Sequence, residues 1–178
     1  MKNGEIDKID FSNWPLPDSY LVEIGRLISV WNAMETFLRS CIGKLTGFDE
    51  LMDPKPFILV NHSSFPQKLD MLSSLCELLK DDFPNLKDYE KTISKLITAQ
   101  KSRNLFIHNS IAVNPNTGKL QIAKASARGK IKASVDNIEI VDIKRAIMDI
   151  DEAHTSLYKL VINKDIDPAW KHLKETSP

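Results

Sequence analysis

The sequence of 178 residues lacks long apolar runs and contains only two cysteines. No apolar stretch approaches the roughly 20 residues that a membrane-spanning helix needs. The polar, acidic start Met1–Asp7 predicts neither a signal peptide nor a transit peptide. Cys41 and Cys76 lie within helix-like patterns, and neither belongs to a Cys-x-x-Cys motif. We therefore expect two small core residues in a reducing cytoplasm, and no disulfide.

Sequence motifs for metal ions and for phosphate-binding loops are also missing. His62, His154 and His172 share no predicted helical face with a cysteine or with paired carboxylates at ligand spacing, so we expect no metal site and no cofactor. The sequence has neither a glycine-rich phosphate loop nor the Gly-x-Ser-x-Gly turn of serine hydrolases. These absences argue against metal-dependent, nucleotide-hydrolysing and serine-nucleophile enzymes.

Acidic residues are absent from Lys91 to Val135, a segment that contains nine basic residues. The whole chain has 24 basic and 24 acidic residues, so the remainder carries 15 basic against 24 acidic residues. Such an asymmetry is expected where one face binds a polyanion. A Lys-rich surface hairpin without any such partner would give the same pattern, and the sequence leaves both interpretations open.

Hydrophobic periodicity predicts an all-α protein that forms a single domain over residues 1–178. The expected architecture is an up-down bundle of four to five helices, with a small β-hairpin inserted before the last helix. Residues 51–62 fit either a short helix or an extended segment. The predicted elements are helices at 18–47, 64–81, 85–111 and 142–163, a hairpin at 112–140, and an irregular tail at 164–178.

Several helix ends carry local signals. Ser64 followed by Gln67 fits a capping box, and Gly47 is expected to close the first helix. The run from Asn114 to Gly118 predicts a turn. The other expected N-caps are Asp18 or Ser19, Asn85 and Asp142.

Polar residues interrupt two of the apolar helix faces. Glu35 falls on the apolar face of the first helix, where a carboxylate needs a cation or hydrogen-bond donors. Asn104 and His108, four residues apart, fall on the expected inward face of the third helix, with Arg103 on its flank. We expect Glu35 to contact Arg103 or His108. The alternatives are that Glu35 lies in water at the edge of a wide apolar face, and that His108 is a core histidine with one hydrogen bond.

At these residues the sequence resembles the HEPN (higher eukaryotes and prokaryotes nucleotide-binding) family. The run Arg103-Asn-Leu-Phe-Ile-His108 is similar to the Arg-x4-His motif of that family. The segment Trp31-Asn-Ala-Met-Glu35 is similar to the acidic first helix of many members. The resemblance spans residues 20–162.

The resemblance implies a metal-independent endoribonuclease of a toxin or phage-defence type, in which the motifs of two protomers face each other across a homodimer cleft. His108 would act as general base or acid on the 2′-hydroxyl or the 5′-oxygen of RNA. Arg103 would hold the phosphate, and Asn104 would orient the pair. The residues expected to support the motif are Glu35, Asn32 and Asn109, and those expected to bind RNA are Lys101, Lys119, Lys124, Arg128, Lys130 and Lys132.

Two other interpretations stay open. The same fold could be a catalytically inactive dimer that serves as a nucleotide-binding, RNA-binding or protein-interaction module, with Arg103 and His108 in structural roles. It could also be a helical partner-binding protein unrelated to RNA. An active member would be expected in the cytoplasm, and an antitoxin protein is a further expected partner.

Overall fold

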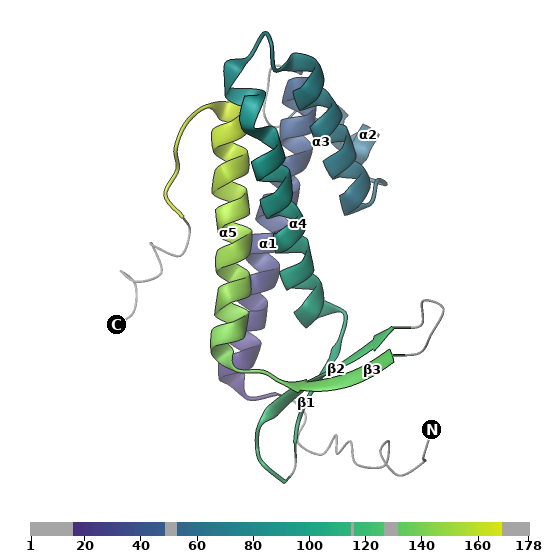
Figure 1. Ribbon diagram of the computed structural model, residues 1–178, viewed down its shortest axis with the longest axis vertical. Coiled ribbons are helices and arrows are strands. Elements are labelled where there is room, and N and C mark those ends of the chain that lie inside the picture. Colours follow the sequence, from purple (N-terminus) through teal and green to yellow (C-terminus); the bar gives the residue numbers. More distant parts are fainter. Residues whose placement is uncertain (1–15, 49–52, 115, 127–131, 169–178) are drawn as a thin grey trace.

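The computed structural model describes residues 16–48, 53–114, 116–126 and 132–168, apart from the side chains of Ser126 and Lys132. Within these residues the chain is mostly helical, with five α-helices, one short 3-10 helix and a small three-stranded antiparallel sheet (Figure 1). The mostly helical class is therefore confirmed. The elements are α1 (Asp18–Leu45), α2 (Pro54–Val60), α3 (Phe65–Leu79), η3 (Pro84–Asp88), α4 (Tyr89–Ile107), β1 (Ser110–Val113), β2 (Leu120–Ser126), β3 (Lys132–Asn137) and α5 (Ile140–Ile162).

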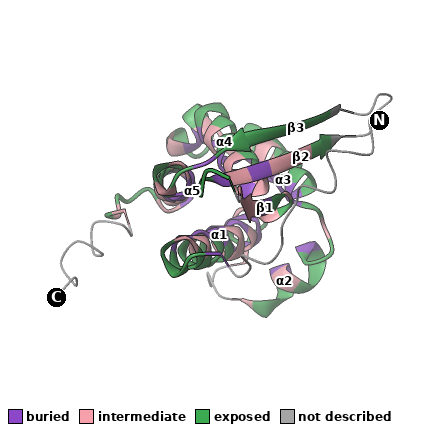
Figure 2. Cartoon of the chain, turned by 90° about the horizontal axis from the view of Figure 1, so that it is seen from below, coloured by how far each residue is buried: buried purple, intermediate pink, exposed green. Residues whose placement is uncertain are grey.

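The three long helices α1, α4 and α5 run beside one another, and the sheet lies at one end of them (Figure 1). Helix α5 packs against both α1 and α4, while α2 and α3 pack against α1. Figure 2 looks along the helices from the end that carries the sheet, and it shows the exposed residues on their outer faces. The side chains that are fully buried between the helices include Leu27, Met34, Leu38, Cys41, Leu72, Cys76, Leu96, Ile143, Ile150 and Leu157.

Helix α1 begins without a side-chain cap. Pro17 is the N-cap, so the expected capping by Asp18 or Ser19 is wrong. Asp18 instead lies in the first turn, where a carboxylate is favoured by the positive end of the helix dipole. The helix ends at Leu45, and Gly47 follows with φ 91°, a left-handed conformation that only glycine adopts without strain.

Residues 54–60 form the short helix α2, which settles the region that the sequence left open. The Asp53 side chain accepts a hydrogen bond from the Lys55 backbone N–H at its start. The predicted capping box of α3 is confirmed. The Ser64 backbone N–H donates to Gln67 Oε1 at 2.8 Å, and the Gln67 N–H donates to Ser64 Oγ at 3.4 Å.

The predicted helix at 85–111 is wrong at both ends. Residues 84–88 form η3, and Asn85 does not cap α4, because its Nδ2 donates to the Leu160 carbonyl oxygen of α5 at 2.6 Å. Helix α4 ends at Ile107, and residues 110–113 form β1 instead of continuing the helix.

The predicted hairpin at 112–140 is present as β2 and β3, but β1 adds a third strand in the order β1-β2-β3. Ile111 of β1 pairs with Ile122 of β2, and both side chains are buried. The predicted turn at Asn114–Gly118 is confirmed, since the Gly118 N–H donates to the Asn114 carbonyl oxygen at 2.8 Å.

Helix α5 begins earlier than predicted. Its N-cap is Glu139, and Asp142 closes a reciprocal capping box three residues later instead of being the cap itself. None of the helices in the described part of the chain is long and apolar enough to cross a membrane.

Candidate functional site

The Arg103–His108 motif lies at the end of α4 that faces the sheet. Arg103 and Asn104 belong to the last two turns of the helix, and His108 is its C-cap residue, with φ −107° and ψ 1°. Arg103 Nη1 lies 2.7 Å from His108 Nε2, and it also donates to Asn104 Oδ1 at 3.0 Å. The structure therefore brings together the three residues that the sequence predicted as catalytic.

The contact between Arg103 and His108 places a cation beside an imidazole. A guanidinium group only donates hydrogen bonds, so Nε2 of His108 is the acceptor in this contact. An imidazole at an exposed residue is a group that transfers protons in general acid–base catalysis.

The expected orientation of these side chains was wrong in part. The buried residues of α4 are Thr92, Leu96, Ala99 and Phe106. Arg103 continues this inward line, four residues after Ala99 and three before Phe106. Asn104 is half-buried like Arg103, so only the predicted inward position of His108, which is exposed, is wrong.

The error has a physical cause. The predicted helix extended to residue 111, and its inward face included Ile97 and Ile111. Ile111 belongs to β1 and not to the helix, and Ile97 is 38% exposed. Once Ile111 is left out, the apolar residues of α4 place the inward face of the helix at Leu96 and Phe106.

Trp31 of α1 stabilises the charged Arg103 side chain at its inward position. The guanidinium carbon lies 5.4 Å from the centroid of the indole ring, within the range of a cation–π interaction. Trp31 is only 4% exposed, so its ring covers part of the guanidinium, while Nη1 of Arg103 contacts both His108 and Asn104.

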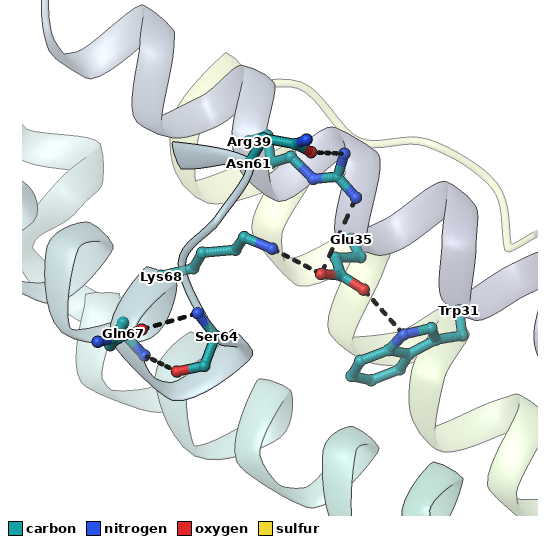
Figure 3. A network of polar contacts seen from close by, with 7 residues as sticks. All are labelled: Trp31, Glu35, Arg39, Asn61, Ser64, Gln67 and Lys68. Atoms are coloured by element: carbon teal, nitrogen blue, oxygen red, sulfur yellow. Dashed lines mark hydrogen bonds and ion pairs between the residues drawn. The ribbon is translucent and has the colours of Figure 1, made fainter. Parts of the chain in front are cut away.

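Glu35 is held by a second set of contacts (Figure 3). Its Oε2 accepts from Trp31 Nε1 at 3.0 Å, and its Oε1 accepts from Lys68 Nζ of α3 at 2.7 Å. Arg39 Nη2 lies 3.9 Å from Glu35 Oε1, farther away than Lys68 Nζ, so Lys68 is the principal cation. The Nε of Arg39 is buried and has no hydrogen-bond partner among the described residues. Burial alone raises the pKa of Glu35, but Lys68, Arg39 and Trp31 together hold it below its usual range.

The expected contact of Glu35 with Arg103 or His108 is therefore wrong. The cation comes from Lys68, and Trp31 separates the carboxylate from the guanidinium. Lys68 carried a signal that the sequence interpretation missed. It lies three residues after Phe65 and four before Leu72, on the buried face of α3, where a charged side chain needs a partner.

The two predicted supporting asparagines differ in what they do. Asn109 Nδ2 donates to the Leu105 carbonyl oxygen at 2.8 Å, so it satisfies an unpaired carbonyl at the end of α4. Asn32 is exposed on α1, and its side chain makes no hydrogen bond within the described ranges. Asn109 thus stabilises the helix end that carries the motif, and Asn32 has no visible part in it.

The basic segment is partly neutralised by acidic residues from outside it. Lys124 pairs with Asp136 at 2.7 Å, and Lys95 pairs with Glu152 of α5 at 2.8 Å. Lys101 and Lys119 are exposed and make no ion pair with any other residue that is described. The predicted RNA-binding residues Arg128 and Lys130, and the side chain of Lys132, lie outside the described residues.

Two cavities lie outside the motif. One of about 300 Å³ is bounded by α4, the sheet and α5, and it includes Ser102, whose hydroxyl donates to Asp149 at 2.6 Å. Another of about 540 Å³ lies between α1, α2 and α3, with mainly apolar walls such as Ile42 and Leu59. No group of three or more His, Cys, Asp or Glu side chains in the described part of the chain could hold a metal ion.

Comparison with known proteins gives no relative from which a role could be transferred to these residues. No family model, no curated protein and no solved structure matches the chain. A functional proposal therefore depends on the contacts of Arg103 and His108 themselves.

Proposed function

We propose that the protein is a metal-independent endoribonuclease of the HEPN type, which acts in the cytoplasm as a homodimer. The proposal includes an up-down connectivity of the helices and composite sites formed by Arg103 and His108 of two copies. The observation that carries it is the 2.7 Å contact between Arg103 Nη1 and His108 Nε2 at an exposed helix end. A permanent cation stabilises the charge that develops on the phosphate, and an imidazole transfers protons, so the two groups together suit metal-independent cleavage of RNA.

The chemistry follows from these two groups. His108 Nε2 takes the proton of the ribose 2′-hydroxyl as its oxygen attacks phosphorus, and the bond from phosphorus to the 5′-oxygen breaks. A protonated His108 from the second copy gives its proton to the leaving oxygen, which yields a 2′,3′-cyclic phosphate and a free 5′-hydroxyl. Arg103 turns from His108 to the phosphate oxygens, where a guanidinium matches the developing charge. One copy supplies a single motif histidine, so acid and base together require two.

A second candidate is favoured by the same contact. Arg103 and His108 bind each other without any substrate. The pair could then be a structural closure of α4 in an inactive dimer that binds nucleotides, RNA or another protein. Binding without cleavage distinguishes this candidate from the ribonuclease.

The test is cleavage of mixed-sequence RNA by purified protein in the presence of a metal chelator. The wild type should cleave RNA but not DNA of the same sequence, since DNA lacks the 2′-hydroxyl. His108→Ala should be slower by at least about 100-fold, the usual contribution of a proton-transferring group. His62→Ala is the matched control, because it removes an exposed histidine outside the motif.

Product analysis and oligomeric state complete the test. Mass spectrometry should find cyclic phosphate ends, and light scattering should give the mass of two chains. Intact RNA with the wild type, or equal rates for wild type and His108→Ala, would overturn the ribonuclease. Retention of intact RNA that depends on Arg103 would then support the binding module.

A further inference from the structure

Trp31 is the point where two sets of contacts meet. On one side its ring faces the Arg103 guanidinium at 5.4 Å. On the other its Nε1 donates to Glu35 at 3.0 Å, and its ring packs against Phe65 of α3 with centroids 4.7 Å apart. Three neighbours from three helices therefore fix the plane of one indole.

The contacts of Glu35 extend this arrangement to the start of α3 (Figure 3). Lys68 binds Glu35 at 2.7 Å and is only 3% exposed, whereas the Glu35 side chain is 21% exposed, so solvent screens the ion pair only in part. Phe65 and Lys68 both belong to the first turn or so of α3, whose start is held by the capping box of Ser64 and Gln67. The line of contacts from Lys68 through Glu35 and Trp31 to Arg103 is here called the Trp31 relay.

We propose that Trp31 is a positioning residue for Arg103, and that Lys68 and Glu35 control its position. The inference builds on the proposed ribonuclease, to which it adds residues from α1 and α3 that touch no substrate. Its physical basis is that a long arginine side chain has many rotamers, and a fixed indole ring restricts those that Arg103 adopts.

The charge of Glu35 adds to the effect of geometry. A carboxylate that accepts the indole N–H polarises the ring and makes its face more negative, which strengthens its attraction for a guanidinium. Hydrogen bonds in series reinforce one another in this way. Lys68 binds Glu35, and Glu35 accepts the Trp31 N–H, so we expect a change at Lys68 to alter the position of Arg103 although the two side chains do not touch.

Stability alone gives little reason for this ion pair. Replacing a buried ion pair by apolar side chains of similar size is often neutral or stabilising. The Lys68–Glu35 pair, next to an arginine at a candidate catalytic site, is better explained by the orientation it imposes.

The test compares Lys68→Met, which removes the cation, with Lys68→Arg, which restores one. The control is Lys80→Met, which breaks the exposed Lys80–Glu77 pair on the same helix. The first readout is nuclear magnetic resonance of the Trp31 Nε1–H and Arg103 Nε–H signals, assigned with Trp31→Phe. Lys68→Met should shift both signals and move that of Arg103 towards the value of free arginine. Lys68→Arg should restore both, and Lys80→Met should leave both unchanged.

The second readout is RNA cleavage at varied substrate concentration. Lys68→Met should lower kcat by about 10-fold with KM changed by less than about 3-fold, because the guanidinium still binds phosphate but is misaligned for reaction. Lys68→Arg should recover most of kcat. If Lys68→Met does not fold, Glu35→Gln replaces it, since an amide oxygen still accepts the Trp31 N–H but lacks the charge.

The outcomes separate this inference from the proposed function. If the wild type does not cleave RNA but the two signals move together, the ribonuclease is refuted and the positioning of Arg103 by Trp31 is supported. If the protein cleaves RNA and the Arg103 signal is unchanged in both Lys68→Met and Glu35→Gln, the ribonuclease stands and the Trp31 relay is overturned.

Discussion

Gly43 is the position where the structure predicts the clearest effect of a single methyl group. Gly43 is buried in α1, and a Cβ added there would lie 2.7 Å from Pro56 Cβ of α2 and closer still to the neighbouring Cγ. Carbon atoms in favourable contact lie about 3.5–4.0 Å apart, so Pro56 would have to retreat by about 1 Å. The proline ring has no alternative rotamer that avoids this contact, so α2 itself must move.

The magnitude follows from two opposing terms. Gly→Ala within a helix gains about 1 kcal/mol from helix propensity, and overpacking costs about 1–3 kcal/mol. Gly25, in the same helix, has nothing within 4 Å of an added Cβ, so Gly25→Ala has the gain without the cost. We expect Gly25→Ala to stabilise the protein by up to about 1 kcal/mol, and Gly43→Ala to be about 1–3 kcal/mol less stable than Gly25→Ala.

Urea unfolding followed by far-ultraviolet circular dichroism measures this difference. In a chain of this size each kcal/mol corresponds to about 2–4 °C in Tm, so a thermal scan gives a second estimate. Equal free energies of unfolding for Gly43→Ala and Gly25→Ala would refute the close packing of α2 on α1.

Two further predictions concern ionisable groups. Burial by itself raises the pKa of Glu35, but Lys68 and its other partners lower it overall, so the stabilisation is present above the unfolded value of 4.5 and is lost as pH falls through the lower folded value. The free energy of unfolding should therefore fall more steeply with acidification in the wild type than in Glu35→Gln, and parallel curves would contradict this. Burial raises the pKa of Cys41 well above its usual value and that of Cys76 to about 11 from 9.0. A thiol reagent at neutral pH should label native Cys76 about 100-fold more slowly than the urea-unfolded chain, and fast labelling of either cysteine would show that it is not buried as described.

Local signals predicted some helix ends and not others. The capping box of Ser64 and Gln67 and the left-handed Gly47 are confirmed, whereas the other expected N-caps are wrong. The end of α4 was missed because it depends on strand pairing with the segment that follows. Ser110–Val113 pair with β2, and the strand hydrogen bonds replace those that a longer helix would have made.

The candidate site divides in the same way. Arg103, Asn104 and His108 meet because all three lie at one helix end, where His108 follows Arg103 by only five positions. The sequence spacing shows this proximity. The partner of Glu35 could not be chosen from the sequence alone. Lys68 lies on another helix, and several cations could have filled that place until the packing of α3 on α1 was known.

The packing of α1 against α5 has a consequence for how the chain reaches its native state. These helices are neighbours in space, although α2, α3, α4 and the whole sheet separate them in sequence. The face of α1 that packs against α5 therefore stays uncovered while a nascent chain leaves the ribosome, until α5 has emerged. Closing so long a loop is entropically expensive, so we expect folding to wait for α5 instead of proceeding helix by helix.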